Sequence, residues 1–200
     1  MIIRTYQQCN KVKNVSTYVA TDSNKIKNVC KDYSIPVVMT SKHCLTGTDR
    51  VYEFSKQYDF KFYINVQGDE PLINPLDIKK IIKFQKQFPN HVINGYTKIK
   101  DVKLLKNINI PKVVFSNQKD LLYMSRGSIP ATKENKVFAS HRQVCIYSYP
   151  KTLLKIFGIK RKKTNLEKIE DIEILRFLEL GIPDKIIELS DKSISVDIPS

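Results

Sequence analysis

Two adjacent carboxylates follow an apolar run in the segment Val66-Gln67-Gly68-Asp69-Glu70-Pro71. The preceding residues 61–66 read KFYINV, which predicts a strand buried on both faces. A glycine after the strand lets the backbone approach a ligand closely. Carboxylate oxygens bind hard cations such as Mg²⁺ together with substrate phosphates, so Asp69 is a candidate metal ligand. The alternative is a plain strand-to-helix turn in which Asp69 caps the helix.

A second polar segment, Leu45-Thr46-Gly47-Thr48-Asp49-Arg50, lies between a predicted strand and a predicted helix. Threonine hydroxyls, free N–H groups at a helix N-terminus and a nearby arginine suit a phosphate or a nucleotide. The alternative is again structural, because Thr46 or Thr48 can simply be the N-cap residue of the helix.

A carboxylate also stands among apolar residues in the predicted helix 166–180. Buried without a partner, such a group costs several kcal/mol or shifts its pKa. Glu173 therefore either binds a polyhydroxyl ligand or forms a salt bridge to Arg126 or Arg142. The residues that share its face at helical spacing are Leu166, Ile169, Phe177 and Leu180.

Two further polar residues end predicted strands. Asp197 follows the last strand and supplies a second metal ligand beside Asp69 if the two strands are neighbours. Arg126 follows the strand 121–125 and is a candidate for holding an anionic group. The three histidines form no cluster, and the four cysteines show no zinc-ligand spacing.

These residues need a sheet to position them. Strand–helix alternation at this spacing, joined by short loops, specifies a parallel sheet with helices on both faces, whose ligands gather at the carboxyl ends of the strands. The sequence therefore predicts an α/β fold, Rossmann-like and mostly parallel. The expected strands are 15–20, 35–39, 61–66 and 91–98, and the expected helices are 22–33, 48–58 and 75–88.

The second half of the chain differs. Residues 113–116 and 121–125 predict an antiparallel hairpin, and a strand at 144–149, helices at 150–157 and 166–180 and short strands at 186–189 and 193–196 follow. The chain begins with an apparent helix, where such a sheet usually begins with a buried strand. We therefore expect one domain over residues 1–200 that is truncated at both ends.

The net charge of the chain indicates which classes of binding partner it favours. Lys and Arg number 34 and Asp and Glu 20, a net charge of +14, which favours nucleic acid, an anionic membrane surface or a phosphorylated substrate. The basic residues are spread along the chain, with one dense run at 160–163, so a nucleic-acid-binding module is the alternative and not the preferred interpretation. We see no membrane-spanning run and no signal peptide, and expect a cytoplasmic protein.

Taken in order, these motifs resemble the 3-deoxy-manno-octulosonate cytidylyltransferases (CMP-Kdo synthetases), over essentially the whole chain. The V-Q-G-D-E-P run is the most specific of them. The other matching segments are A-T-D at 20–22, T-G-T-D-R at 46–50, K-V-V at 112–114, Y-M-S-R-G-S-I-P at 123–130, I-Y at 146–147, L-E-x-x-E-x-x-E-x-L-R at 166–176 and V-D-x-P at 196–199.

The resemblance implies a nucleotide-diphospho-sugar transferase fold and transfer of CMP from CTP to the anomeric hydroxyl of an acidic eight-carbon sugar, with release of pyrophosphate. It also implies a homodimer whose contact involves the region 111–150. Another sugar-acid nucleotidyltransferase on the same fold is the alternative. By analogy, Asp69 and Asp197 bind Mg²⁺, Gln67 lies beside nucleotide and sugar, Thr46, Gly47, Thr48 and Arg50 contact the nucleotide, and Arg126, Gln143, Tyr147 and Glu173 line the sugar pocket.

The chain departs from this family in three places. The family's opening strand and basic, glycine-containing triphosphate loop are absent, as is the helix after V-D-x-P, so we expect little or no transferase activity from these 200 residues alone. Gln143 replaces a sugar-contacting histidine, with His141 two residues earlier on the same strand face. Ile174 replaces a glutamine. The last two changes leave a related keto-sugar acid open as the substrate.

Overall fold

One long strand, β7 (His141–Pro150), holds the main sheet together in the computed structural model, which describes residues 1–131, 133 and 140–192. It runs antiparallel to β3 (Phe62–Val66), β4 (Val92–Lys98) and β5 (Lys112–Phe115). On the far side of β4 lies β8 (Asp184–Glu188), parallel to it, and β6 (Leu121–Ser125) forms a hairpin with β5. The order of the path is β6-β5-β7-β4-β8, with β3 paired to β7 off this path.

Two further strands, β1 (Val19–Thr21) and β2 (Val37–Met39), pair in parallel as a separate two-stranded sheet. The expected α/β fold and the expected hairpin are both confirmed. β3, β4, β5 and β8 share one direction, yet four of the six pairings among the described strands are antiparallel. The reason is that β7 returns between β3 and β4, so parallel strands become neighbours of an antiparallel one.

Helices follow the strands as the sequence predicts, and the chain begins with one, α1 (Ile2–Asn10). Side-chain caps set the starts of the next three, α2 (Asn24–Asp32), α3 (Gly47–Ser55) and α4 (Pro75–Gln87). Ser23, Thr46 and Asn74 accept hydrogen bonds from backbone N–H groups in the respective first turns. Each oxygen satisfies an orphan donor of its helix.

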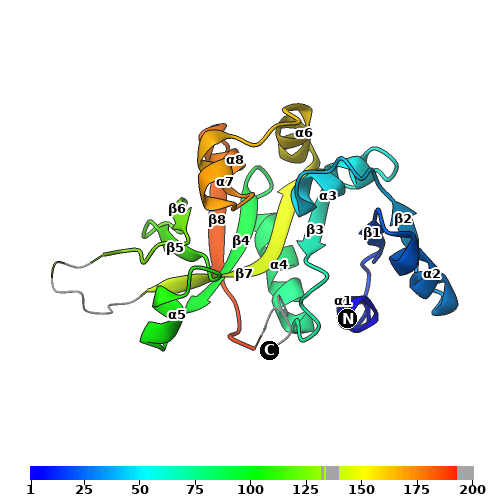
Figure 1. Ribbon diagram of the computed structural model, residues 1–200, viewed down its shortest axis with the longest axis horizontal. Helices are drawn as coiled ribbons and strands as arrows, with labels where there is room; N and C mark the ends of the chain where they lie inside the picture. Colours follow the sequence, from blue (N-terminus) through cyan, green and yellow to red (C-terminus); the bar gives the residue numbers. More distant parts are fainter. Residues whose placement is uncertain (132, 134–139, 193–200) are drawn as a thin grey trace.

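The sheet is covered on both faces, as Figure 1 shows. On one face α3, α6 (Lys151–Ile159) and α8 (Leu175–Glu179) pack through a core that includes Phe54, Leu154 and Phe177. On the other face α4 packs through Ile78 and Ile81, together with the end of α1. The site segments therefore lie at strand ends between two helical layers.

The single helix expected at 166–180 is wrong. The chain forms α7 (Asn165–Glu170), breaks at Asp171, whose φ is 50°, and resumes as α8. Aspartate enters this left-handed region more readily than most residues. Leu166 and Ile169, expected on a buried stripe, are 37% and 77% exposed, because the break separates α7 from the face that α8 buries.

Two smaller differences concern a short helix and the last expected strand. A short helix, α5 (Val102–Lys106), was not expected; Asp101 caps it through the N–H of Lys103. The strand expected at 193–196 lies outside the described residues. None of the helices in the described part of the chain is long and apolar enough to cross a membrane.

Candidate active site

The V-Q-G-D-E-P segment leaves the end of β3 as a turn that α1 supports. The N–H of Glu70 donates to the carbonyl of Gln67 at 3.2 Å. The hydroxyl of Thr5, buried in α1, donates to the carbonyl of Gly68 at 3.0 Å. A helix from the very start of the chain therefore fixes the backbone that carries Asp69.

A cavity of about 800 Å³ opens beside this turn. Gln67, Gly68 and Asp69 line it, and Gly47 and Arg50 of α3 face it as well. The structure thus brings together the two polar segments singled out in the sequence, across one hollow at the ends of β1 and β3. A volume of this size is in the range of small-molecule sites.

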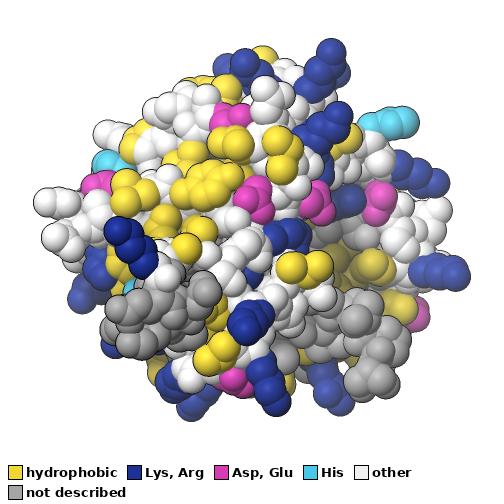
Figure 2. All heavy atoms as spheres, turned by 60° about the vertical axis from the view of Figure 1, so that its left-hand side comes forward, with side chains coloured by type: hydrophobic (Ala, Val, Ile, Leu, Met, Phe, Trp, Pro, Cys, Tyr) yellow, Lys and Arg dark blue, Asp and Glu magenta, His cyan; other side chains and the backbone are white. Residues whose placement is uncertain are grey.

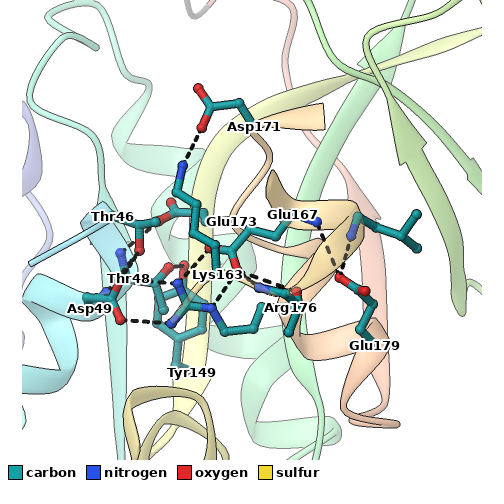
Figure 3. Close-up of polar contacts among 12 residues, drawn as sticks. Thr46, Thr48, Asp49, Tyr149, Lys163, Glu167, Asp171, Glu173, Arg176 and Glu179 are labelled. Carbon is teal, nitrogen blue, oxygen red and sulfur yellow. Dashed lines mark hydrogen bonds and ion pairs between the residues drawn. The ribbon is translucent and has the colours of Figure 1, made fainter. Parts of the chain in front are cut away.

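The T-G-T-D-R segment forms the N-terminus of α3 (Figure 3). Thr46 is the N-cap, and its hydroxyl accepts from the N–H of Asp49 at 3.2 Å. Thr48 is fully buried, with its hydroxyl 2.8 Å from the hydroxyl of Tyr149. The capping role is therefore present, and of the predicted nucleotide contacts in this segment Gly47 and Arg50 are the ones that reach the cavity.

Arg50 joins the ends of both strands of the small sheet. Its guanidinium lies 3.3 Å from the carboxylate of Asp22, just after β1, and donates to the hydroxyl of Thr40, just after β2, at 2.5 Å. These contacts hold the arginine at the carboxyl ends of the strands, where an α/β sheet binds its ligands.

Glu173 lies in the turn between α7 and α8 and not in a helix interior. Its Oε2 atom accepts from the backbone N–H of Thr48 at 2.8 Å, whereas its Oε1 atom is buried without a hydrogen-bond partner among the described residues. Burial raises the pKa of this carboxyl. Both oxygens lie 3.6 Å from the point that a Cβ on Gly47 would occupy, so Glu173 stands directly behind the cavity wall.

A row of hydroxyl and amide groups on β7 leads toward Glu173. Gln143 donates through Nε2 to the hydroxyl of Tyr147 at 3.0 Å, and the rings of Tyr147 and Tyr149 stack 6.1 Å apart. Burial raises the pKa of both tyrosines well above the ordinary value. Cys145, which lies between Gln143 and Tyr147 along β7, has its pKa raised to about 12 by burial and by the charges of Glu70, Asp69 and Glu173.

Arg126 occupies a different place from these groups. Its guanidinium donates to the carbonyls of Glu170 and Asp171 at 2.6 and 3.1 Å and to that of Ile108 at 3.1 Å. It therefore closes the C-terminus of α7, where carbonyls lack helical partners. The alternative of a salt bridge from Arg126 to Glu173 is therefore not realised. The backbone N–H of Arg126 instead donates to the carboxylate of Glu170 at 2.8 Å.

One charged group was missed in the sequence. Arg176 is fully buried and pairs with Asp49 at 2.8 Å and with Glu167 at 2.6 Å. Figure 3 shows this network beside Thr48 and Glu173. An arginine between Leu175 and Phe177 was the available signal, since a charge inside an apolar run requires a buried partner.

Residues 1–189 match the family model described as cytidylyltransferase. The chain belongs to this cytidylyltransferase family.

The chain is similar to two cytidylyltransferases that act on different manno-octulosonates. The chain is 36% identical over 201 residues to a 3-deoxy-manno-octulosonate cytidylyltransferase of Rickettsia prowazekii, covering 98% of this chain and 79% of the relative. It is 32% identical over 205 residues to an 8-amino-3,8-dideoxy-manno-octulosonate cytidylyltransferase of Shewanella halifaxensis, covering all of this chain and 83% of the relative.

One solved structure agrees with the cytidylyltransferase assignment, and a second shares the fold. The structure of a CMP:2-keto-3-deoxy-manno-octonic acid synthetase in complex with CTP superposes with a TM-score of 0.90 at 27% identity, over 98% of this chain and 81% of that one. A 4-diphosphocytidyl-2C-methyl-D-erythritol synthase from Anaerococcus prevotii shares the fold, with a TM-score of 0.63 at 15% identity over 98% of this chain and 79% of that one.

The two carboxylates predicted as metal ligands are described in part. Asp69 lines the cavity, whereas Asp197 lies outside the described residues. Among the described residues no three acidic, histidine or cysteine side chains cluster as a metal site. One carboxylate at a cavity that also presents an arginine nevertheless fits Mg²⁺, which binds one or two carboxylates and completes its shell with phosphates and water.

Proposed function

We propose that this chain binds CTP in the cavity between β1, β3 and α3 and serves the transfer of CMP to an acidic eight-carbon sugar of the 3-deoxy-manno-octulosonate type. Pyrophosphate is the leaving group. The observation that carries the proposal is the close superposition on a CTP-bound synthetase, together with a cavity lined by Gly47, Arg50, Gln67 and Asp69.

In this proposal the anomeric hydroxyl of the sugar attacks the α-phosphate of CTP, and the protein positions both substrates and neutralises charge. Gln67 contacts nucleotide and sugar at the end of β3, and Arg50 and Gly47 contact the nucleotide from α3. Thr46 and Thr48 support the nucleotide site indirectly, because their hydrogen bonds fix the start of this helix.

The sugar side of the site is proposed around β7 and the α7–α8 turn. Glu173 Oε1, which is buried without a partner among the described residues, is suited to accept a hydrogen bond from a sugar hydroxyl. Gln143 and Tyr147 are already joined to each other and present one polar row. Arg126 contributes by holding the turn that carries Glu173, through the carbonyls of Glu170 and Asp171.

Mg²⁺ is the proposed cofactor, with Asp69 and Asp197 as its protein ligands. Bound there, it would neutralise charge on the phosphates of the nucleotide. The chain's own residues would position the nucleotide and keep the sugar hydroxyl oriented.

We further propose a homodimer, formed through the region 111–150, that acts in the cytoplasm on these small-molecule substrates and not on nucleic acid. The β5–β6 side of the molecule supports the dimer. Leu122 in β6 and Ile108 just before β5 are 61% and 67% exposed. Figure 2 shows apolar side chains gathered on this face between basic ones, as at subunit contacts.

Ligand-linked stabilisation tests the nucleotide assignment. The unfolding temperature of the 200-residue chain is measured with Mg²⁺ and CTP, UTP or GTP, because a ligand that binds the folded state stabilises it. We expect the largest rise with CTP. The Asp69→Asn variant should lose the Mg²⁺-dependent part of that rise, whereas Asp32→Asn, the same charge change at an exposed residue of α2, should keep it.

Two outcomes would contradict the proposal. An equal or larger rise with UTP or GTP would assign the cavity to another nucleotidyltransferase. A rise with CTP that Asp69→Asn leaves intact would remove Asp69 from the metal site. Transfer itself is tested by incubating the chain with CTP, Mg²⁺ and the sugar acid and measuring pyrophosphate, with either substrate omitted as the control.

A further inference from the structure

The outer face of α6 is apolar and exposed to solvent. The helix packs inward through Phe157 and Gly158, and a Cβ on Gly158 would lie 2.0 Å from the ring of Tyr52 in α3. This close packing turns the other side of the helix outward, at the upper edge of the molecule in Figure 1. Ile156 and Ile159, one turn apart on that side, are 46% and 61% exposed.

Basic side chains continue directly from this face. Lys155 is exposed one turn before Ile159, and Lys160, Arg161 and Lys162 follow the end of the helix, all of them exposed. Among the residues that the structure describes, none of these four basic side chains forms an ion pair. Their charges therefore face solvent beside the two isoleucines.

The acidic residues nearby are bound within the protein. Glu167 is buried and pairs with Arg176, and Asp171 pairs with Lys163. The carboxylate of Glu170 accepts hydrogen bonds from the end of β6. The outward charge of this surface is consequently that of its lysines and its arginine.

The residues among these charges favour a lipid surface over nucleic acid. Nucleic-acid sites interleave basic residues with aromatic ones that stack on bases. The exposed apolar side chains here are the aliphatic Ile156, Ile159 and, in α7, Ile169, whereas the aromatic residue of α6, Phe157, is buried. Aliphatic side chains enter the boundary between head groups and acyl chains, where neighbouring Lys and Arg meet anionic head groups.

We propose that the outer face of α6 and the start of the following loop form a docking surface for an anionic lipid bilayer. The isoleucines enter the interfacial layer, and the basic side chains bind head-group phosphates. The net charge of +14 attracts the whole molecule to such a bilayer, and this surface decides which side meets it. We call it the α6 patch; it consists of Lys155, Ile156, Ile159, Lys160, Arg161 and Lys162.

The α6 patch is separate from the candidate active site. None of its residues lines the cavity. The N–H of Lys151, where α6 begins, donates to the carbonyl of Lys61 at 3.1 Å, just before β3 starts, whereas Gln67 and Asp69 follow the end of that strand. Lipid binding is therefore tested without nucleotide, and its result does not depend on the proposed function.

Sedimentation with lipid vesicles tests the role of charge. The full chain is mixed with vesicles of phosphatidylcholine, alone or with about one third phosphatidylglycerol, at about 0.1 M salt, where charges still act over about 10 Å. We expect binding to the anionic vesicles only. The double variant Lys160→Glu with Lys162→Glu should bind them at least tenfold more weakly, because each basic residue near such a surface contributes about fivefold.

A second double variant separates the α6 patch from net charge. Lys79→Glu with Lys83→Glu makes the same change of charge at two exposed residues of α4, which covers the opposite face of the sheet. It should bind anionic vesicles nearly as well as the parent chain. Thermal unfolding of both variants checks that each is folded.

A single tryptophan tests the role of the isoleucines. The chain contains no tryptophan, so Ile159→Trp gives one emission signal. Its emission should move to shorter wavelength on anionic vesicles, since an indole prefers the membrane interface to water. The matched control is Leu76→Trp in α4, at a residue that is 60% exposed, and its emission should not move.

The proposal fails if neutral vesicles bind equally well, if both charge-reversal variants lose binding equally, or if the emission of Ile159→Trp does not move on vesicles that bind the chain. Binding to single-stranded RNA but to neither kind of vesicle, abolished by Lys160→Glu with Lys162→Glu, would assign the α6 patch to nucleic acid. Self-association that Ile159→Ser prevents, without vesicle binding, would assign it to a second copy of the chain.

Discussion

The guanidinium of Arg176 and the carboxylate of Asp49 lie 2.8 Å apart, although the two residues are 127 positions apart in the chain. The same guanidinium binds Glu167 through two further hydrogen bonds and lies 3.8 Å above the ring of Phe157. Arg176 therefore joins four helices, α3, α6, α7 and α8, at the point where α3 begins. This network fixes the helix that carries Gly47 and Arg50 to the cavity.

Replacing Arg176 should destabilise the protein severely. Arg176→Met keeps the apolar stem but leaves Asp49 and Glu167 as buried carboxylates without their cation, which costs about 3–5 kcal/mol. Urea denaturation of parent and variant measures the difference in unfolding free energy. The control is Lys151→Met, which breaks an exposed ion pair to Asp59 and should leave the urea midpoint nearly unchanged. Equal shifts in both variants would contradict the buried role.

The hydroxyls of Thr48 and Tyr149 should behave as a coupled pair. They lie 2.8 Å apart and are fully buried. Thr48→Val or Tyr149→Phe alone leaves one buried hydroxyl without this partner, at about 1–3 kcal/mol each. The double variant should cost less than the sum of the two, which a double-mutant cycle in urea measures. Strict additivity would show that the two hydroxyls do not depend on each other.

The carboxyl of Asp184 should contribute more to the stability of the fold in acid than at neutral pH. Burial in β8 raises the pKa of this carboxyl well above its ordinary value, despite a hydrogen bond from Asn94 at 2.6 Å. The folded state then keeps a proton that the unfolded state releases, so the unfolding free energy falls as pH rises from the ordinary carboxyl range, about pH 4, toward the raised pKa.

Asp184→Asn removes that titration. We expect its unfolding free energy to fall less between about pH 4 and 7 than that of the parent chain, as urea titrations at several pH values would show. Glu173, whose pKa is raised in the same direction, should retain part of the slope. The variant Asp32→Asn, at an exposed residue, should follow the parent; an unchanged slope in Asp184→Asn would refute the assignment.

Replacing either of two glycines with alanine should destabilise the protein, for a different reason in each case. A Cβ on Gly158 of α6 would lie 2.0 Å from the ring of Tyr52 in α3, so Gly158→Ala forces these helices apart at about 1–3 kcal/mol. Gly181 has a φ of 68° with nothing near its Cβ position, so Gly181→Ala costs about 1–2 kcal/mol of backbone strain alone. Trimming Tyr52 to Ala should relieve part of the first cost and none of the second, as thermal unfolding would show.

Much of the molecule follows from local sequence. The sequence located α2, α3 and α4 because the signals for a helix start are local. Ser23, Thr46 and Asn74 cap these helices with their side chains. The sequence also located the hairpin of β5 and β6, where a polar turn separates two apolar runs. The order of the motifs along the chain indicated the family, with V-Q-G-D-E-P as the most specific of them.

Tertiary contacts decided the rest. The break at Asp171, which moved Glu173 from a helix interior to a turn, follows from partners far away in the chain, Arg126 at the end of α7 and Thr48 at the start of α3. Helical periodicity carries no information about such partners, so the predicted apolar stripe was wrong. The position of Asp69 across one cavity from Gly47 and Arg50 likewise exists only once the tertiary structure places β1 and β3 on either side of that cavity.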